Sequence, residues 1–348
     1  MRHLAQRAGR TSLAGVTDDM KTPTLDDVAA AANVSAATIS RWFNNPEIVA
    51  PATGERIRLA VDKLGYIPNL MAGGLASNRS RLVAVMIPQL SSSIFVGTIE
   101  AMVSELGAAG YVTMLAVTGL GEDRFNELVR AALGRRAEAI VITGTVDAAT
   151  RKVLRRSGAT VIEIWDLPED PVDVAIGFSH HEIGAELARF VRGKGYSHPH
   201  LLMPETARAR QRREGFIAEW QAQGGDLPSE TPISLPGHLS DARTCFAQIR
   251  TLDPRPDVVI CGSDLLALGL LDEASAAGLS IPGEFGVIGF GNTRLAMDAR
   301  TPITSVDIDG TRIAREAIAV LRQRTGQTGK ASRRIDVGFS IVERQSTR

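Results

Sequence analysis

The sequence contains only two cysteines, Cys245 and Cys261, in 348 residues. They are too few and too widely spaced for a disulfide framework or a four-thiolate zinc site. An excess of charge is also missing, since 39 lysines and arginines balance 39 aspartates and glutamates. The average charge therefore does not identify a polyanion-binding protein, although it does not exclude a local basic patch.

No apolar run is long enough to cross a membrane. The longest uncharged run, residues 82–99, is interrupted by Pro88, Gln89 and three serines, which a lipid-facing helix would not carry. Residues 1–22 lack the apolar core of a signal peptide, and we predict that they form a disordered tail. We therefore expect a cytoplasmic protein that has no membrane partner.

The composition is that of an ordinary globular protein, with 44% hydrophobic and 22% charged residues. The first block with a clear pattern, residues 23–67, is predicted to be entirely helical. Thr24 and two following carboxylates begin one helix, Ser35 caps a second over 36–43, and a third follows over 51–64. Two short helices joined at Asn33 resemble a DNA-reading helix–turn–helix.

A helical hairpin that never touches DNA is the alternative interpretation of this block. Charge supports DNA binding only weakly, because residues 24–81 hold six basic and five acidic residues, a net charge of +1. Phosphate neutralisation supplies most of the affinity for DNA, so one such domain would bind feebly. A dimer that places two domains on two half-sites would compensate.

The second helix carries the predicted reading residues. Arg41 can bond bidentately to guanine, and small alanines can meet thymine methyl groups. Hydroxyls near the start of the helix suit phosphate contacts. The residues predicted to face DNA from this helix and its cap are Ser35, Ala36, Ala37, Thr38, Ser40 and Arg41.

After Arg81 the pattern changes to apolar runs that alternate with amphipathic stretches. The predicted strands are 82–87, 112–117, 139–143, 160–164, 200–203, 257–261 and 286–290. Helical patterns between them include 95–109, 124–133, 181–192, 208–221 and 265–277. This alternation predicts parallel sheets in βαβ units, and its length predicts two doubly wound lobes with a ligand cleft at the strand ends.

Several motifs together resemble the lactose-repressor (LacI/GalR) family of bacterial transcription regulators. They are Thr24–Ala29, Val34–Arg41, Leu64–Asn69, Arg212–Phe216, Ser263–Gly269 and Val287–Asn292. The resemblance implies a helix–turn–helix head at 23–67, a hinge at 68–80 and a two-lobed, periplasmic-binding-protein-like α/β core at 81–348. It adds Thr24, Asn44, Asn69 and Leu75 to the DNA contacts, with Leu75 as a wedge in the minor groove.

Within this family, the segments around Phe95, Thr143 and Trp165 look most like the gluconate-operon repressors. The resemblance places the effector contacts at Ser93, Phe95, Thr143, Trp165, Asp166, Arg212, Ser263 and Asn292. Trp165 and Phe95 would pack on sugar carbons, and Asp166, Ser263 and Asn292 would satisfy hydroxyls. Arg212 would pair with a carboxylate through its planar fork.

The two motifs that could indicate an enzyme are both incomplete. Residues 119–124 lack the third glycine of a dinucleotide loop, and Gly262-Ser263-Asp264 lacks the closing glycine of a nucleophile elbow. No cofactor and no metal site are predicted. The sequence therefore predicts a repressor of a gluconate-type operon that binds operator DNA and a sugar acid as a homodimer or tetramer.

Three alternatives stay open at this point. They are a periplasmic sugar-binding protein with a similar core, a Rossmann-type enzyme, and a regulator that responds to a different sugar or to a nucleobase. The helix–turn–helix head and the missing signal peptide weigh against the first, and the missing cofactor loop weighs against the second.

Overall fold

Three helices make up the N-terminal part of the chain in a computed structural model. The structure describes residues 22–68, 80–90, 93–119, 121–144, 146–324 and 333–348. The chain divides into two compact units, Met1–Arg79 and Ser80–Arg348. The predicted tail at 1–22 and hinge at 68–80 lie almost wholly outside the described residues. None of the helices in the described ranges is long and apolar enough to cross a membrane.

The helices of the first unit are α1 (Leu25–Ala32), α2 (Ala36–Asn44) and α3 (Pro51–Leu64), with a 3₁₀ turn at Pro46–Ile48. Their limits agree with the predicted ones to within a residue. Thr24 and Asp27 form a reciprocal capping box, with the Asp27 amide 3.3 Å from Thr24 Oγ1 and the Thr24 amide 2.8 Å from Asp27 Oδ2. Asn33 ends α1 in the left-handed conformation, at φ +53°.

A small apolar core holds these helices together. Val28, Ile39 and Ile57, one from each helix, have no exposed surface. Trp42 and Phe43 extend the core, with their ring centroids 5.0 Å apart and edge to face. The unit is therefore a closed three-helix domain with its own core.

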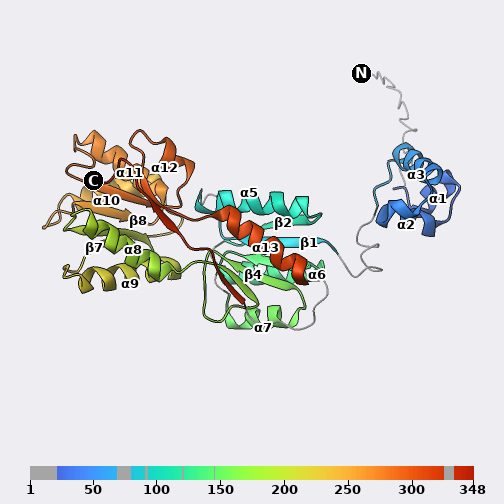
Figure 1. Ribbon diagram of the computed structural model, residues 1–348, viewed down its shortest axis with the longest axis horizontal. Helices are drawn as coiled ribbons and strands as arrows, with labels where there is room; N and C mark the ends of the chain where they lie inside the picture. Colours follow the sequence, from blue (N-terminus) through green and yellow to red (C-terminus); the bar gives the residue numbers. More distant parts are fainter. Residues whose placement is uncertain (1–21, 69–79, 91–92, 120, 145, 325–332) are drawn as a thin grey trace, which may run out of the picture. The chain divides into compact units, whose positions relative to one another are not determined.

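The second unit contains two six-stranded sheets within the described residues, which we call lobe 1 and lobe 2 (Figure 1). Lobe 1 contains β1 (Leu82–Ile87), β2 (Val112–Val117), β3 (Ala139–Ile142), β4 (Thr160–Ile164), β5 (Val174–Gly177) and β11 (Arg333–Asp336) with α5 (Ser93–Ala108), α6 (Glu122–Gly134), α7 (Ala148–Arg156) and α13 (Gly310–Arg324). Lobe 2 contains β6 (Pro199–Pro204), β7 (Ser229–Ile233), β8 (Val258–Cys261), β9 (Gly286–Phe290), β10 (Thr304–Asp307) and β12 (Ser340–Val342) with α8 (His180–Gly193), α9 (Ala207–Ala222), α10 (Leu239–Ile249), α11 (Asp264–Ala276) and α12 (Arg294–Asp298).

Strand order confirms that both lobes are doubly wound. It is β11-β5-β4-β3-β1-β2 in lobe 1 and β12-β10-β9-β8-β6-β7 in lobe 2. The pairs are parallel except for β12, which runs antiparallel to β10. In lobe 1, Val83 and Val85 pack with α5 and α13, whereas Ala84 and Met86 pack with α6 and α7. Both faces are therefore covered, as the continuous apolar strands predict.

The chain crosses between the lobes three times within the described residues. The crossings lie at Phe178–Ser179, at Ile308–Asp309 and between β11 and β12 (Figure 1). Each lobe is consequently assembled from separate stretches of the chain.

Candidate functional site

A cavity of about 600 Å³ opens between the two lobes, at the carboxyl ends of their parallel strands. From lobe 1 it is lined by Pro88, Gln89, Ile94, Phe95, Thr118, Gly119, Gly121, Phe125, Thr143, Gly144, Asp147 and Trp165. From lobe 2 it is lined by His180, Pro204–Arg208, Arg212, Ile233–Gly237, Gly262, Ser263, Leu265, Leu266 and Phe290. Its volume and mixed lining are those of a small-molecule site.

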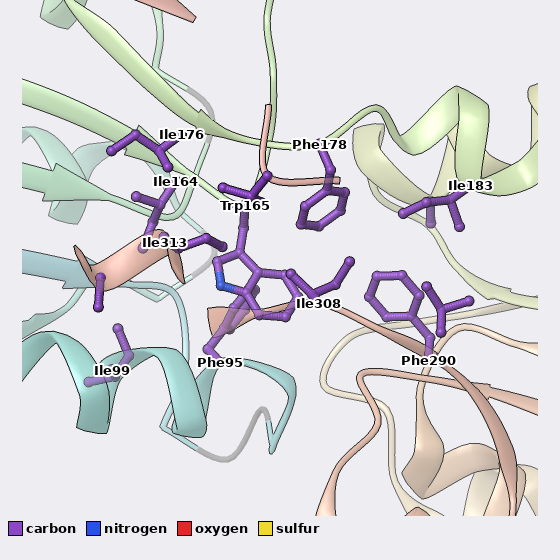
Figure 2. Close-up of a cluster of buried hydrophobic side chains, with 14 of the residues drawn as sticks. Phe95, Ile99, Ile164, Trp165, Ile176, Phe178, Ile183, Phe290, Ile308 and Ile313 are labelled. Atoms are coloured by element: carbon purple, nitrogen blue, oxygen red, sulfur yellow. The ribbon is translucent and has the colours of Figure 1, made fainter. Parts of the chain in front are cut away.

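Trp165 forms the apolar wall of the cavity. Its indole lies edge to face against Phe95 at 5.0 Å between centroids and 6.5 Å from Phe290 of the other lobe (Figure 2). The indole Nε1 donates to Thr98 Oγ1 at 3.0 Å, which fixes the ring. Trp165 has φ +65°, a conformation that bulky residues rarely adopt and that clusters at ligand sites.

Arg212 supplies a buried positive charge. Its side chain is 5% exposed, and its guanidinium carbon lies 4.2 Å above the centre of the Phe290 ring. Nη1 donates to His180 Nδ1 at 2.9 Å, and Nε has no partner among the described residues. Burial, together with the charge of Arg208, lowers the pKa of Arg212 to about 9, so the group stays cationic at neutral pH.

His180 is held neutral beside this cation. Arginine only donates, so Nδ1 of His180 must accept, and Nε2–H then donates to the Trp165 carbonyl oxygen at 3.0 Å. Burial first, and then the charge of Arg212, lowers the pKa of His180 to about 2.

A close approach of two helices places Arg212 beside His180. A β-carbon at Gly184 of α8 would overlap the Arg212 carbonyl oxygen, and one at Gly215 of α9 would overlap the His181 carbonyl oxygen. Only glycine permits this backbone-to-backbone contact. The Arg212–Phe216 motif thus contains both the cation and the glycine that positions it.

Arg208, one turn before Arg212, reaches from lobe 2 to lobe 1. Its Nε lies 3.3 Å from Asp166 Oδ2, and its Nη2 donates to the Ile164 carbonyl oxygen at 3.1 Å. Sequence patterns do not single out Arg208 or His180, because neither belongs to a motif with a site-specific spacing. Both line the cavity.

Five of the predicted effector contacts line the cavity: Phe95, Thr143, Trp165, Arg212 and Ser263. The hydroxyl of Thr143 donates to the Met86 carbonyl oxygen, and that of Ser263 caps α11. Asp147, which no sequence motif indicates, also lines the cavity. Its Oδ1 accepts two amides at the start of α7, and its Oδ2 is buried with no partner among the described residues. The structure does not describe the side chain of Ser93, so its predicted contact with the effector stays a prediction.

Asp166 and Asn292 are not among the residues that line the cavity, and their contact with the effector stays a prediction. Asp166 is bound by Arg208 and accepts from the Leu167 amide at 2.8 Å. Asn292 donates to Asp307 at 2.8 Å and accepts from Arg344 at 2.6 Å. Other residues of the same chain therefore form hydrogen bonds with both side chains.

The surface of α2 is the candidate nucleic-acid interface. Its outward face carries the exposed side chains Ala37, Ser40, Arg41 and Asn44. Ser35 caps the helix by accepting from the Thr38 amide at 3.2 Å, and Thr24 caps α1. Ala36 differs from expectation, since it is half-buried against the head's core. Asn69 and Leu75 lie outside the described residues.

Comparison with known proteins decides the family. Residues 24–69 match the model for bacterial regulatory proteins of the lacI family, and residues 188–347 match the periplasmic binding protein-like domain. The chain belongs to the LacI family of bacterial transcription regulators. As a LacI-family protein it is a DNA-binding regulator and not an enzyme.

Relatives of this LacI-family protein align with nearly its whole length. The chain is 27% identical to "HTH-type transcriptional regulator GntR" of Escherichia coli K12, over 92% of this chain and 97% of that protein. It is also 27% identical to "HTH-type transcriptional repressor PurR" of Vibrio atlanticus, over 93% and 98%. A LacI-family regulator from Silicibacter pomeroyi has a similar crystal structure, with a TM-score of 0.83, 29% identity and coverage of 93% and 99%.

Proposed function

We propose that this repressor is released from its operator by a sugar acid of the gluconate type, bound in the cavity between the lobes. The observation that carries the proposal is Arg212, a buried guanidinium without a carboxylate partner among the described residues. An uncompensated buried charge is several kcal/mol unfavourable, so such a site favours an anionic ligand. A GntR-named relative at 27% identity supports the same ligand class.

The ligand would bind with its carboxylate toward Arg212, whose Nε–H has no acceptor among the described residues. Its carbons would pack against Trp165 and Phe95. The hydroxyl end would meet Oδ2 of Asp147, which has no hydrogen-bond partner among the described residues. This oxygen can accept hydrogen bonds from hydroxyl groups, but it would repel a carboxylate. Asp147 thus takes the role that the sequence resemblance assigns to Asp166.

DNA release would follow from movement of the lobes. Two heads of a homodimer would read two half-sites, with Arg41 on a guanine and Ser35 and Thr38 on phosphates. Exposed apolar side chains on α5, Val96 at 44% and Val103 at 42%, support a second copy packing there. An effector coupling of about 1–3 kcal/mol would change operator occupancy 5–150-fold.

A purine base is the second candidate ligand. Phe95, Trp165 and Phe290 give the cavity aromatic walls on which a base can stack, and PurR-named proteins are among the relatives. A neutral base would leave Arg212 without an anion, which is why we favour the sugar acid.

Titration calorimetry distinguishes these ligands. We expect gluconate to bind at least tenfold more tightly than sorbitol or hypoxanthine, because only gluconate supplies a carboxylate to Arg212. Arg212→Gln should remove the preference for the acid. Arg210→Gln, at an exposed position on the same helix, is the matched control and should retain the preference.

Equal affinities for gluconate and sorbitol would contradict the sugar-acid assignment, and tight binding of hypoxanthine alone would establish the purine. A gel shift with fragments flanking the protein's own gene then tests release. The bound fraction should fall when the tight ligand is added, and a rise would mean that the ligand acts as a corepressor.

A further inference from the structure

Exposed arginines gather at one edge of lobe 1. Arg81 directly precedes β1, Arg135 and Arg136 lie between α6 and β3, Arg156 ends α7 ahead of β4, and Arg333 begins β11. All five side chains are exposed, and none forms an ion pair with another residue in the described part of the chain. We call these five residues the arginine edge.

The sheet topology brings the arginine edge together. The strands β11, β5, β4, β3 and β1 are adjacent and parallel, so their first residues lie along the same edge of the sheet. Four strand spacings of about 4.8 Å make this edge about 20 Å wide. Phosphates recur about every 3.4 Å along each strand of a DNA duplex, so such a width spans about six base pairs.

Acidic side chains near this edge are already engaged. Glu138 accepts from the Arg81 amide at 2.7 Å, Asp170 pairs with Arg155 at 2.8 Å, and Asp173 pairs with Arg324. Asp170 and Asp173 are neutralised by arginines outside the arginine edge, whereas Glu138, whose partner is an uncharged amide, offsets one of its five charges.

The arginine edge lies where the core joins the segment that leads to the head. The Ser80 hydroxyl donates to the Arg136 carbonyl oxygen at 2.5 Å, so the first described residue of the core contacts the loop that bears two of the arginines. Covalent geometry limits the distance from Pro68 to Ser80 to about 40 Å. The length of this segment thus limits how far the arginine edge can lie from a duplex that the head binds.

Helix dipoles alone do not explain the arginines, although cations are favoured at helix C-termini. Lobe 2 has the same architecture, and its helices end at the equivalent edge. There the connections into β7, β8 and β9 carry four acidic residues, Asp226, Asp253, Asp257 and Glu284, beside Arg250 and Arg255. Counted with Lys194 and Arg300, which precede β6 and β10, this edge of lobe 2 holds four basic and four acidic residues, whereas five arginines without an ion-pair partner among the described residues gather at the edge of lobe 1.

We propose that the arginine edge is a second DNA-contacting surface, which binds the phosphate backbone flanking the operator without reading bases. It supplies the electrostatic affinity that the head segment lacks, since residues 24–80, counted without Arg81, hold five basic and five acidic residues. The proposal rests on DNA binding by the head but not on the identity of the effector.

The test measures binding of the full chain to a duplex of about 40 base pairs and arbitrary sequence by fluorescence anisotropy, between about 50 and 200 mM salt. The triple variant Arg135→Gln/Arg136→Gln/Arg156→Gln should bind at least tenfold more weakly at low salt. Its salt slope should fall by about 0.9 for each phosphate that the variant no longer neutralises, hence by about two to three. The matched control, Arg250→Gln/Arg255→Gln/Arg300→Gln, removes the same charge from exposed positions of lobe 2.

An unchanged slope and affinity in the first triple variant would overturn the proposal. An equal loss in the control would also overturn it, because the effect would then come from net charge and not from a surface. If the unaltered chain bound no DNA at all, the repressor function itself would fail and this inference with it. Thermal unfolding of both variants verifies that the core is intact.

Discussion

At the scale of single residues, the cavity depends on a pair that holds one charge and one neutral ring. Arg212 stays cationic because His180 offers it a lone pair and not a second positive charge. Burial of the ring lowers the pKa of His180 most, to about 2, and the charge of Arg212, whose Nη1 is 2.9 Å from Nδ1, lowers it further. The pair thereby keeps the charge of the site constant at physiological pH.

Because His180 is neutral in the folded chain, the free energy of unfolding should depend on pH. The pKa of His180 rises from about 2 in the folded chain to the ordinary 6.5 on unfolding, so the unfolded chain binds the proton more tightly. The free energy of unfolding should therefore fall as the pH drops below about 6.5, by up to about 1.4 kcal/mol per pH unit from this group. His180→Gln, which offers a donor and an acceptor but does not titrate, should reduce that slope in urea unfolding between about pH 6.5 and 5.

The slope should not vanish in this variant, because burial also lowers the pKa of His200, to about 4. His181→Gln, at the neighbouring exposed position, controls for the loss of an imidazole. Identical slopes for His180→Gln and the unaltered chain would show that the ring is not buried in its neutral form.

Arg41 permits a test of base reading at the same scale. Arg41→Ala should cost about 1–3 kcal/mol and relax sequence preference at one operator position, as selection from a randomised duplex library would show. Arg56→Ala, in the neighbouring helix α3, is the control. A uniform loss of affinity across all sequences would instead assign Arg41 to a phosphate.

At the scale of elements, the contact between α8 and α9 determines the geometry of the site. Gly184 and Gly215 allow the two backbones to touch, and a single methyl group there must separate them. Gly215→Ala should therefore move Arg212 away from His180 and weaken ligand binding at least tenfold in calorimetry, while the circular dichroism spectrum stays native. Gly193→Ala, where a β-carbon meets no atom within 4 Å, should leave affinity unchanged.

Sequence patterns predict a strand where its residues form an apolar run of five or six residues, whether the strand is internal or at an edge of its sheet. Residues 82–87, 112–117, 160–164 and 286–290 are strands with the predicted limits. β1, β4 and β9 are buried on both faces, as continuous apolar runs predict, whereas β2 is an edge strand with mostly exposed or half-buried residues. Five strands are not predicted by these patterns. β5 and β10 are internal strands of only four residues each. The edge strands β7, β11 and β12 carry residues such as Arg333 and Pro232, which a sheet tolerates only at its margin. Helix α7 also went unpredicted, since its nine residues include four basic side chains.

The site was predictable only where a motif fixes a residue's role. Arg212 and Trp165, two of the predicted effector contacts, line the cavity, because Arg212 lies in one motif with Gly215 and Trp165 directly follows β4. The sequence does not predict the partners that Asp166 and Asn292 have in the structure, namely Arg208, Asp307 and Arg344. Which partner captures a polar side chain depends on tertiary packing, and no local pattern encodes it.

At the scale of the whole molecule, Arg208 couples the two lobes. It holds Asp166 and the Ile164 carbonyl oxygen of lobe 1 from helix α9 of lobe 2. Arg208→Ala should lower the free energy of local opening between the lobes by about 1–2 kcal/mol. Amide hydrogen exchange at the crossing Ile308–Asp309 should therefore accelerate about 5–30-fold. Arg213→Ala, which breaks a pair with Glu230 inside lobe 2, is the control and should not affect that crossing. Unchanged exchange in Arg208→Ala would mean that the crossings alone set the lobe angle.

The three crossings also govern how the protein is made. The face of lobe 1 built by residue 178 awaits α13, and its sheet awaits β11, both more than a hundred residues later. A ribosome that adds about 5–20 residues per second needs roughly 8–30 s to travel from Phe178 to Arg333. During that interval an apolar sheet face and an open strand edge are available for aggregation, whereas the contiguous head can already fold. We therefore expect the nascent core, and not the head, to be the client of ribosome-associated chaperones.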